Sequence, residues 1–136
     1  MRLIVLCCAL LVCNVVLAEY AVIVHPSNQS SLSALDIRRI YLAKVKQFPD
    51  GEMVQAIDRP EGTDIRGAFV QYFLHTDEQR LRAYLARLLF TGKVILPKIL
   101  SSDEDVVNAV ANNPGTIAFV EAGFVDPQRV RVVATF

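Results

Sequence analysis

The stretch MVQAIDRPEGTDIRGAFVQYF, residues 53–73, contains a strand candidate, a loop and a helix candidate in one continuous run. Met53 to Ile57 has the apolar character of a strand, and Pro60 and Gly62 then mark a loop. The last part has the spacing of a helix with one buried face, formed by Ile65, Ala68, Phe69, Tyr72 and Phe73. A strand that passes through a short loop into a helix indicates an α/β domain.

Further strand and helix candidates lie on both sides of this stretch. Strands are predicted at residues 20–24, 116–120 and 130–136 from their apolar content. Three more helices are predicted from capping pairs, which are Ser33 with Asp36, Thr76 with Gln79, and Ser101 with Glu104. The two helices that meet at residues 75–76 are expected to pack as a hairpin. The expected order is β-α-β-α-α-α-β-β, a mixed sheet with flanking helices in a three-layer-like α/β arrangement.

Length and charge restrict the class of protein. The chain has 136 residues, 53% of them apolar, which suffices for one compact domain with a buried core and is too short for two full lobes. Lys and Arg together number 14, as do Asp and Glu, so the formal net charge is +0. Because a general nucleic-acid binder relies on a broad positive field, this balance argues against nucleic acid as a partner.

The first 18 residues have the pattern of a secretory signal. Arg2 precedes an apolar run of about 15 residues, shorter than the roughly 20 that span a bilayer, and small residues follow near Ala18. We therefore predict cleavage before Glu19, a mature domain of residues 19–136 and a periplasmic location, with an uncleaved membrane anchor as the alternative. All three cysteines (Cys7, Cys8 and Cys13) lie in this segment, so the mature chain has no disulfide and no thiolate.

The loop between the strand and the helix of the opening stretch is the first candidate binding site. Free backbone N–H groups at a helix start favour an anion, Gly62 allows close backbone approach, Thr63 can donate its hydroxyl, and Arg59 can clamp an oxyanion. The carboxylates of Asp58, Glu61 and Asp64 oppose an anion there. In the purely structural alternative, Thr63 or Asp64 only caps the helix and Arg59 pairs with Asp58.

A second candidate is the loop after the first strand, where Ser27 and Asn28 offer hydroxyl and amide donors at a strand's carboxyl end. An ordinary polar loop is the alternative. His25 and His75 have no other ligand at metal-binding spacing, so no metal is expected. The chain has no motif of an activated nucleophile or an acid–base pair, so we expect neither an enzyme nor a cofactor. Five arginines are interpreted as parts of solvated helix faces, or alternatively of a docking face for an acidic partner or lipid headgroups; they are Arg38, Arg39, Arg80, Arg82 and Arg87.

Five segments occur in an order that matches a known family. They are LSALDIRRIYLA (residues 32–43), FPDG (48–51), RPEGT (59–63), FTG (90–92) and NPGTIAFV (113–120). Together they resemble the phosphate-binding periplasmic proteins of phosphate ABC transporters, whose anion loop has the pattern Arg-x-x-x-Ser-Gly-Thr. The chain carries Glu61 beside Gly62, where the family has a serine.

The resemblance implies a single lobe of a type II periplasmic binding-protein-like fold. It also implies that phosphate or another small oxyanion is held by Arg59, Gly62 and Thr63, and that an ABC permease is a partner. Because the resemblance covers one lobe only, the alternative is a non-transport interaction or regulatory module of the cell envelope that docks on a permease or a sensor protein. Unpaired sheet edges in a lone lobe would also favour a homodimer.

Overall fold

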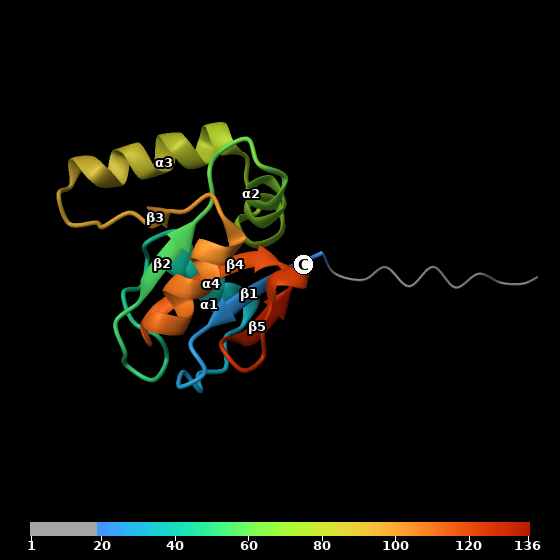
Figure 1. Cartoon of the computed structure of the whole chain (residues 1–136). Coiled ribbons are helices and arrows are strands. Elements are labelled where there is room, and N and C mark those ends of the chain that lie inside the picture. Colours follow the sequence, from blue (N-terminus) through green and yellow to red (C-terminus); the bar gives the residue numbers. More distant parts are fainter. Residues whose placement is uncertain (1–18) are drawn as a thin grey trace, which may run out of the picture.

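A computed structural model describes residues 19–136, and the predicted secretory signal lies outside the described residues (Figure 1). No helix within this range is both long and apolar enough to cross a bilayer. The elements in chain order are β1 (Tyr20–Val24), α1 (Ala34–Tyr41), β2 (Gln55–Asp58), α2 (Asp64–Phe69), the π-helical segment η1 (Val70–Leu74), α3 (Glu78–Phe90), β3 (Lys98–Ile99), α4 (Asp103–Asn112), β4 (Thr116–Glu121), the 3-10 turn η2 (Ala122–Phe124) and β5 (Arg131–Thr135).

The five strands form one mixed sheet in the order β3-β2-β4-β1-β5. β2 is parallel to β3 and β4, whereas β1 is antiparallel to β4 and β5. The predicted mixed α/β sheet is therefore confirmed. Since β1 is antiparallel to β4 and β2 is parallel to β4, the C-terminal ends of β1 and β2 lie at opposite ends of the strands of the sheet.

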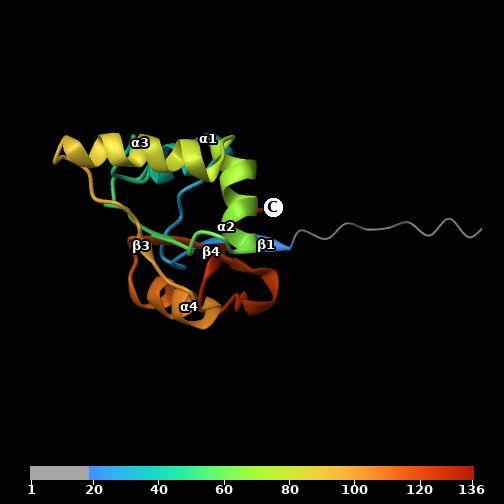
Figure 2. The ribbon, with the colours of Figure 1, turned by 90° about the horizontal axis from the view of Figure 1, so that it is seen from above.

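Both faces of the sheet are buried, which gives the molecule three layers. On β4, Ile117 and Phe119 belong to the core under α1, α2 and α3, whereas Ala118 and Val120 belong to the core that α4 covers. β1 alternates in the same way. Figure 2 shows α1, α2 and α3 on one side of the sheet and α4 on the other. The two-residue alternation of a strand thus explains why these strands are apolar at almost every position.

The first and last strands meet at one corner of the sheet. The backbone N–H of Tyr20 donates to Phe136 O at 3.0 Å, and the N–H of Phe136 donates back to Tyr20 O at 3.0 Å. Their rings also lie against each other, with centroids 5.3 Å apart. The described domain therefore begins and ends at the same place.

Two of the three predicted helix caps are displaced by one residue. Ser33 and Asp36 form the predicted capping box of α1. α3 is instead capped by Asp77, which accepts from the Arg80 N–H, and α4 by Ser102, which accepts from the Asp105 N–H. α2 and α3 run in different directions in Figure 2, so the predicted helical hairpin is wrong. The left-handed backbone of His75, with φ of 52°, redirects the chain between them.

Tyr41 links α1 to two neighbouring strands through its buried hydroxyl. The hydroxyl donates to Ile57 O of β2 at 2.9 Å and also lies 3.3 Å from Ile117 O of β4. Burial, followed by the nearby charge of Asp58, raises the pKa of Tyr41 well above its ordinary value. The folded protein therefore holds the protonated phenol more strongly than the unfolded chain does.

We expect Tyr41→Phe to lower the free energy of unfolding at pH 7 by about 0.5–1.5 kcal/mol, because buried carbonyls lose a donor. The contribution of the protonated phenol is fully present below the unfolded pKa of about 10 and is lost as pH rises through the higher folded pKa. The variant should therefore lose less stability than wild type in alkaline solution. Urea unfolding followed by circular dichroism measures both effects. Tyr72→Phe, at an exposed ring, is the control, and equal alkaline sensitivity of Tyr41→Phe and wild type would contradict this role.

Candidate functional site

The loop of residues 59–63 leaves the end of β2 and enters α2. Gly62 has a φ of +85°, and a Cβ placed there would meet nothing within 4 Å, so the loop is open at this residue. Thr63 is the N-cap of α2, but its side chain accepts no cap hydrogen bond and its hydroxyl instead donates to Pro60 O at 2.7 Å. No hydrogen bond among the described residues uses the backbone N–H groups of Asp64 and Ile65. The helix start therefore retains free donors.

Arg59 is the first residue of this loop, and it is only 3% exposed. Its guanidinium donates to the backbone oxygens of Leu100, Ser101 and Phe119 and to Asp103 Oδ1, at distances of 2.9 to 3.1 Å. An arginine has five N–H donors, and these contacts use four of them. The side chain thus ties the end of β2 to β4 and to the segment before α4. Its donors are committed to protein oxygens rather than to a site at Gly62 and Thr63.

Arg66 on α2 is a second buried arginine, and it is not among the predicted site residues. Its Nη1 lies 3.0 Å from Asp58 Oδ2 and donates to Arg59 O, and its Nε lies 3.0 Å from Glu78 Oε1. Asp58 is therefore the ion-pair partner of Arg66, while Arg59 gives it only a backbone N–H at 2.8 Å. One signal could have identified Arg66, which is its position one turn before Phe69 and Val70 on the apolar face of the helix.

Burial and nearby charge shift the pKa values of the acids around the loop in different directions. Desolvation raises the pKa of Asp58, and the charge of Arg66 only partly offsets it. Desolvation likewise raises the pKa of Glu78. The exposed Glu61 receives a hydrogen bond from Arg82 Nη2 at 2.7 Å, and this bond lowers its pKa. Glu61 is therefore a carboxylate held by α3 at the rim of the open loop.

The segment with Ser27 and Asn28 follows β1, at the opposite end of the sheet's strands from this loop. Figure 1 shows the segment after β1 at the bottom of the molecule and the β2–α2 loop at the top. Ser27 Oγ contacts His25 Nδ1 at 2.7 Å. Asn28 is fully buried and accepts from the Ser30 N–H, and its Nδ2 has no partner among residues 19–136. The structure thus brings Arg59, Gly62 and Thr63 to one loop and places the other two predicted residues elsewhere.

The structure describes a pocket, and it lies away from the loop. Among residues 19–136, no group of three or more His, Cys, Asp or Glu side chains is placed to hold a metal ion. A pocket of about 280 Å³ lies between α1 and the chain that follows it, lined in part by Asp36, Arg39 and Phe48. This pocket is near the start of β2, and the candidate loop is at its end.

The fold of the described residues is similar to that of solved structures of phosphate-transport binding proteins. One similar structure, from Clostridium perfringens, is assigned as a phosphate ABC transporter substrate-binding protein and has bound phosphate; it is 20% identical, with a TM-score of 0.65. An ABC-type phosphate transport receptor from Vibrio cholerae is 14% identical and PstS from Borrelia burgdorferi is 10% identical, each with a TM-score of 0.65.

The likeness covers nearly all of this chain and less than half of each similar structure. The chain is covered to 85%, 85% and 86%, whereas those three proteins are covered to 44%, 45% and 47%. The single-lobe fold expected from the sequence resemblance is therefore confirmed. No family model matches the chain. No curated protein matches it either.

Proposed function

We propose that the domain binds a small oxyanion such as phosphate at the β2–α2 loop. The observation that carries the proposal is the fold likeness over 85% of the chain to phosphate-binding proteins, one of which has bound phosphate. The open backbone at Gly62 and the free N–H groups of Asp64 and Ile65 support the same location. The Thr63 hydroxyl would give up its hydrogen bond to Pro60 O and donate to the ligand instead. In this proposal the protein is a binding protein and not an enzyme.

The charges around the loop favour weak binding. Arg59 has one uncommitted N–H, and the nearest exposed acids, Glu61 and Asp64, carry the same sign as the ligand. An open single lobe also leaves water around the anion, which reduces the strength of each charge-assisted hydrogen bond. We therefore expect a dissociation constant in the millimolar range, which corresponds to a binding free energy of about −4 kcal/mol.

Glu61→Gln is expected to tighten phosphate binding by about two- to fivefold, because it removes a nearby like charge and frees Arg82 in a solvent-exposed setting. Calorimetry with phosphate and with sulfate measures the affinity. Chemical-shift changes of the backbone amides of residues 62–65, seen by nuclear magnetic resonance, locate the binding site. Glu52→Gln, an exposed acid before β2, is the matched control and should not change the affinity. If neither phosphate nor sulfate at millimolar concentration changes the chemical shifts of these amides, the oxyanion proposal fails.

A second candidate function is an interaction or regulatory module of the cell envelope. The observation that favours it is the commitment of the Arg59 guanidinium to protein oxygens, which removes the main cation from an anion site. In this case the partner is an ABC permease or an envelope sensor protein. Capture from envelope extracts would give a stoichiometric partner without any need for phosphate. Signal cleavage before Glu19 and a periplasmic location belong to both proposals. The similar structures give no support for a homodimer.

A further inference from the structure

The second half of α3 and the chain after it form a protrusion, which we define as residues 87–99 and call the α3–β3 protrusion. The first half of α3 is anchored by Leu81, which is 3% exposed, and by Tyr84, whose hydroxyl donates to Leu42 O at 2.8 Å. Beyond these contacts the chain extends away from the body before it returns as β3 beside β2 (Figure 1). The protrusion is thus held at both ends and exposed between them.

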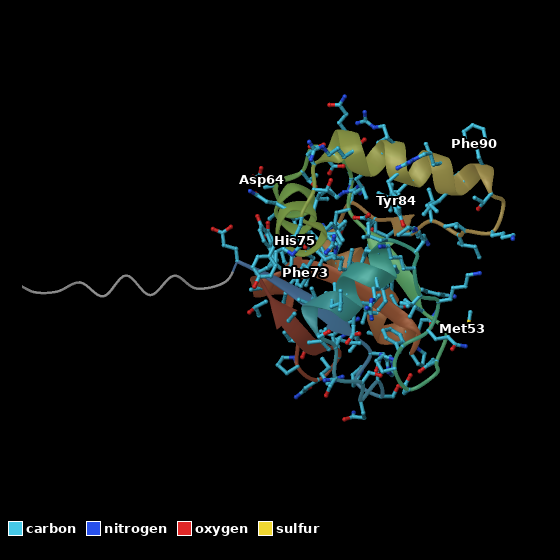
Figure 3. The ribbon with its side chains drawn as sticks, turned by 180° about the vertical axis from the view of Figure 1, so that it is seen from behind. Met53, Asp64, Phe73, His75, Tyr84 and Phe90 are labelled. Atoms are coloured by element: carbon cyan, nitrogen blue, oxygen red, sulfur yellow. The ribbon has the colours of Figure 1, made fainter. Side chains whose placement is uncertain are left out.

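The protrusion presents large apolar side chains to solvent. Phe90 is 93% exposed and Ile95 is 94% exposed, the highest values among the large apolar residues that the structure describes. Leu89 and Ile99 are 52% and 57% exposed. Phe90 lies at the outer end of α3, pointing away from the body (Figure 3). Side chains of this size on a projecting segment indicate a contact surface rather than a part of the core.

The charge of the protrusion has one sign. It contains Arg87, Lys93 and Lys98, all exposed, and no Asp or Glu occurs anywhere in residues 79–102. None of the three cations forms an ion pair with the part of the chain that the structure describes. The 14 acidic residues of the sequence therefore all lie outside this segment. The segment that carries the exposed Phe90 and Ile95 therefore has positive charges only.

We propose that the α3–β3 protrusion docks on the surface of an anionic lipid bilayer. Phe90 and Ile95 enter the interface between headgroups and acyl chains, while Arg87, Lys93 and Lys98 lie against anionic headgroups. The shape favours a bilayer over a protein partner, because lipids part around a convex apolar tip whereas a protein must offer a matching groove. This inference goes beyond oxyanion binding, since the protrusion and the β2–α2 loop are separate surfaces.

Co-sedimentation of residues 19–136, which contain both cores and every strand, with vesicles tests the docking. Vesicles of phosphatidylcholine mixed with phosphatidylglycerol should retain the protein, and vesicles of phosphatidylcholine alone should not. Added salt should weaken the binding, because the headgroup attraction is screened over about 10 Å at 0.1 M. Equal binding to both vesicle types, or no binding to either, overturns the proposal. The assay contains no phosphate, so its outcome is independent of the oxyanion site.

Matched variants locate the contact. The double variant Phe90→Ser with Ile95→Ser should lower the vesicle affinity by about tenfold or more, since it removes two large apolar groups from the interface. Met53→Ser, at another exposed apolar residue, should leave the affinity unchanged. Lys93→Glu should weaken binding more than Arg129→Glu, which changes the same charge next to α4 on the other side of the sheet. Circular dichroism spectra confirm that the variants fold. Unchanged binding of the double variant, or equal effects of the two charge reversals, would contradict the assignment.

Discussion

Arg59→Ala is expected to lower the free energy of unfolding by about 3–5 kcal/mol, because removing one partner of a buried ion pair leaves the other uncompensated. Nη1 of Arg59 lies 2.9 Å from Asp103 Oδ1, and three backbone carbonyls lose their donor in the same substitution. Asp103 also accepts from the Glu121 N–H at 3.0 Å, so the end of β4 is affected too. Urea unfolding at pH 7, followed by circular dichroism, measures the loss.

Arg82→Ala is the matched control for Arg59→Ala. Arg82 pairs with Glu61 at 2.7 Å, but both side chains are exposed, so its loss should cost less than about 1 kcal/mol. The comparison also separates two roles for Arg59. A folded Arg59→Ala protein with the stability of Arg82→Ala and no phosphate binding would identify Arg59 as a ligand residue, contrary to the structural role that its contacts indicate.

Phe69→Ala is expected to cost about 3–5 kcal/mol, because it leaves a cavity at the centre of the larger core. The Phe69 ring is 1% exposed and stacks on Phe119 of β4, with centroids 4.0 Å apart and planes 6° from parallel. It also meets Tyr41 of α1 edge-on at 4.6 Å. One side chain thus joins α2, α1 and the sheet. The change in the urea midpoint, with an unchanged slope, measures the loss.

Phe90→Ala changes the same kind of side chain at a position that is 93% exposed. We expect its effect on the free energy of unfolding to lie within about 0.5 kcal/mol of zero, since no buried contact is lost. A large loss of stability in Phe90→Ala would mean that Phe90 packs on the body of the protein. In that case Phe90 would not be available to enter a bilayer, and the lipid proposal would lose its main apolar contact.

Local sequence signals predicted most of the elements, and long-range contacts explain what they missed. The Ser33 and Asp36 pair and the apolar run of residues 20–24 depend on neighbours within a few positions, and both predictions are confirmed. β3 has only two residues and exists because Ile57 and Asp58 of β2 pair with it. No local pattern marks such a strand. Asp77 replaced Thr76 as the cap of α3 because two adjacent residues were both capable of capping.

In the candidate site too, local signals predicted some features, and long-range contacts decided the others. The sequence predicted correctly that a loop with Gly62 and Thr63 joins a strand to a helix start. The contacts of Arg59 could not be foreseen, because its four acceptors lie 41, 42, 44 and 60 residues further along the chain. The separation of Ser27 and Asn28 from the loop follows from the antiparallel direction of β1, which depends on pairing with β4. Oxyanion binding at the loop itself stays a prediction.

The mutual hydrogen bonds of Tyr20 and Phe136 have a consequence for how this domain can be joined to other polypeptide. Because the two residues are neighbours, the domain can be spliced into a surface turn of a host protein with its sheet intact. After burial and Glu19, the charge of Asp64 helps to raise the pKa of Tyr20, so the start of α2 lies near the same corner. A module joined at this corner would therefore leave the pairing of β1 with β4 and β5 unchanged.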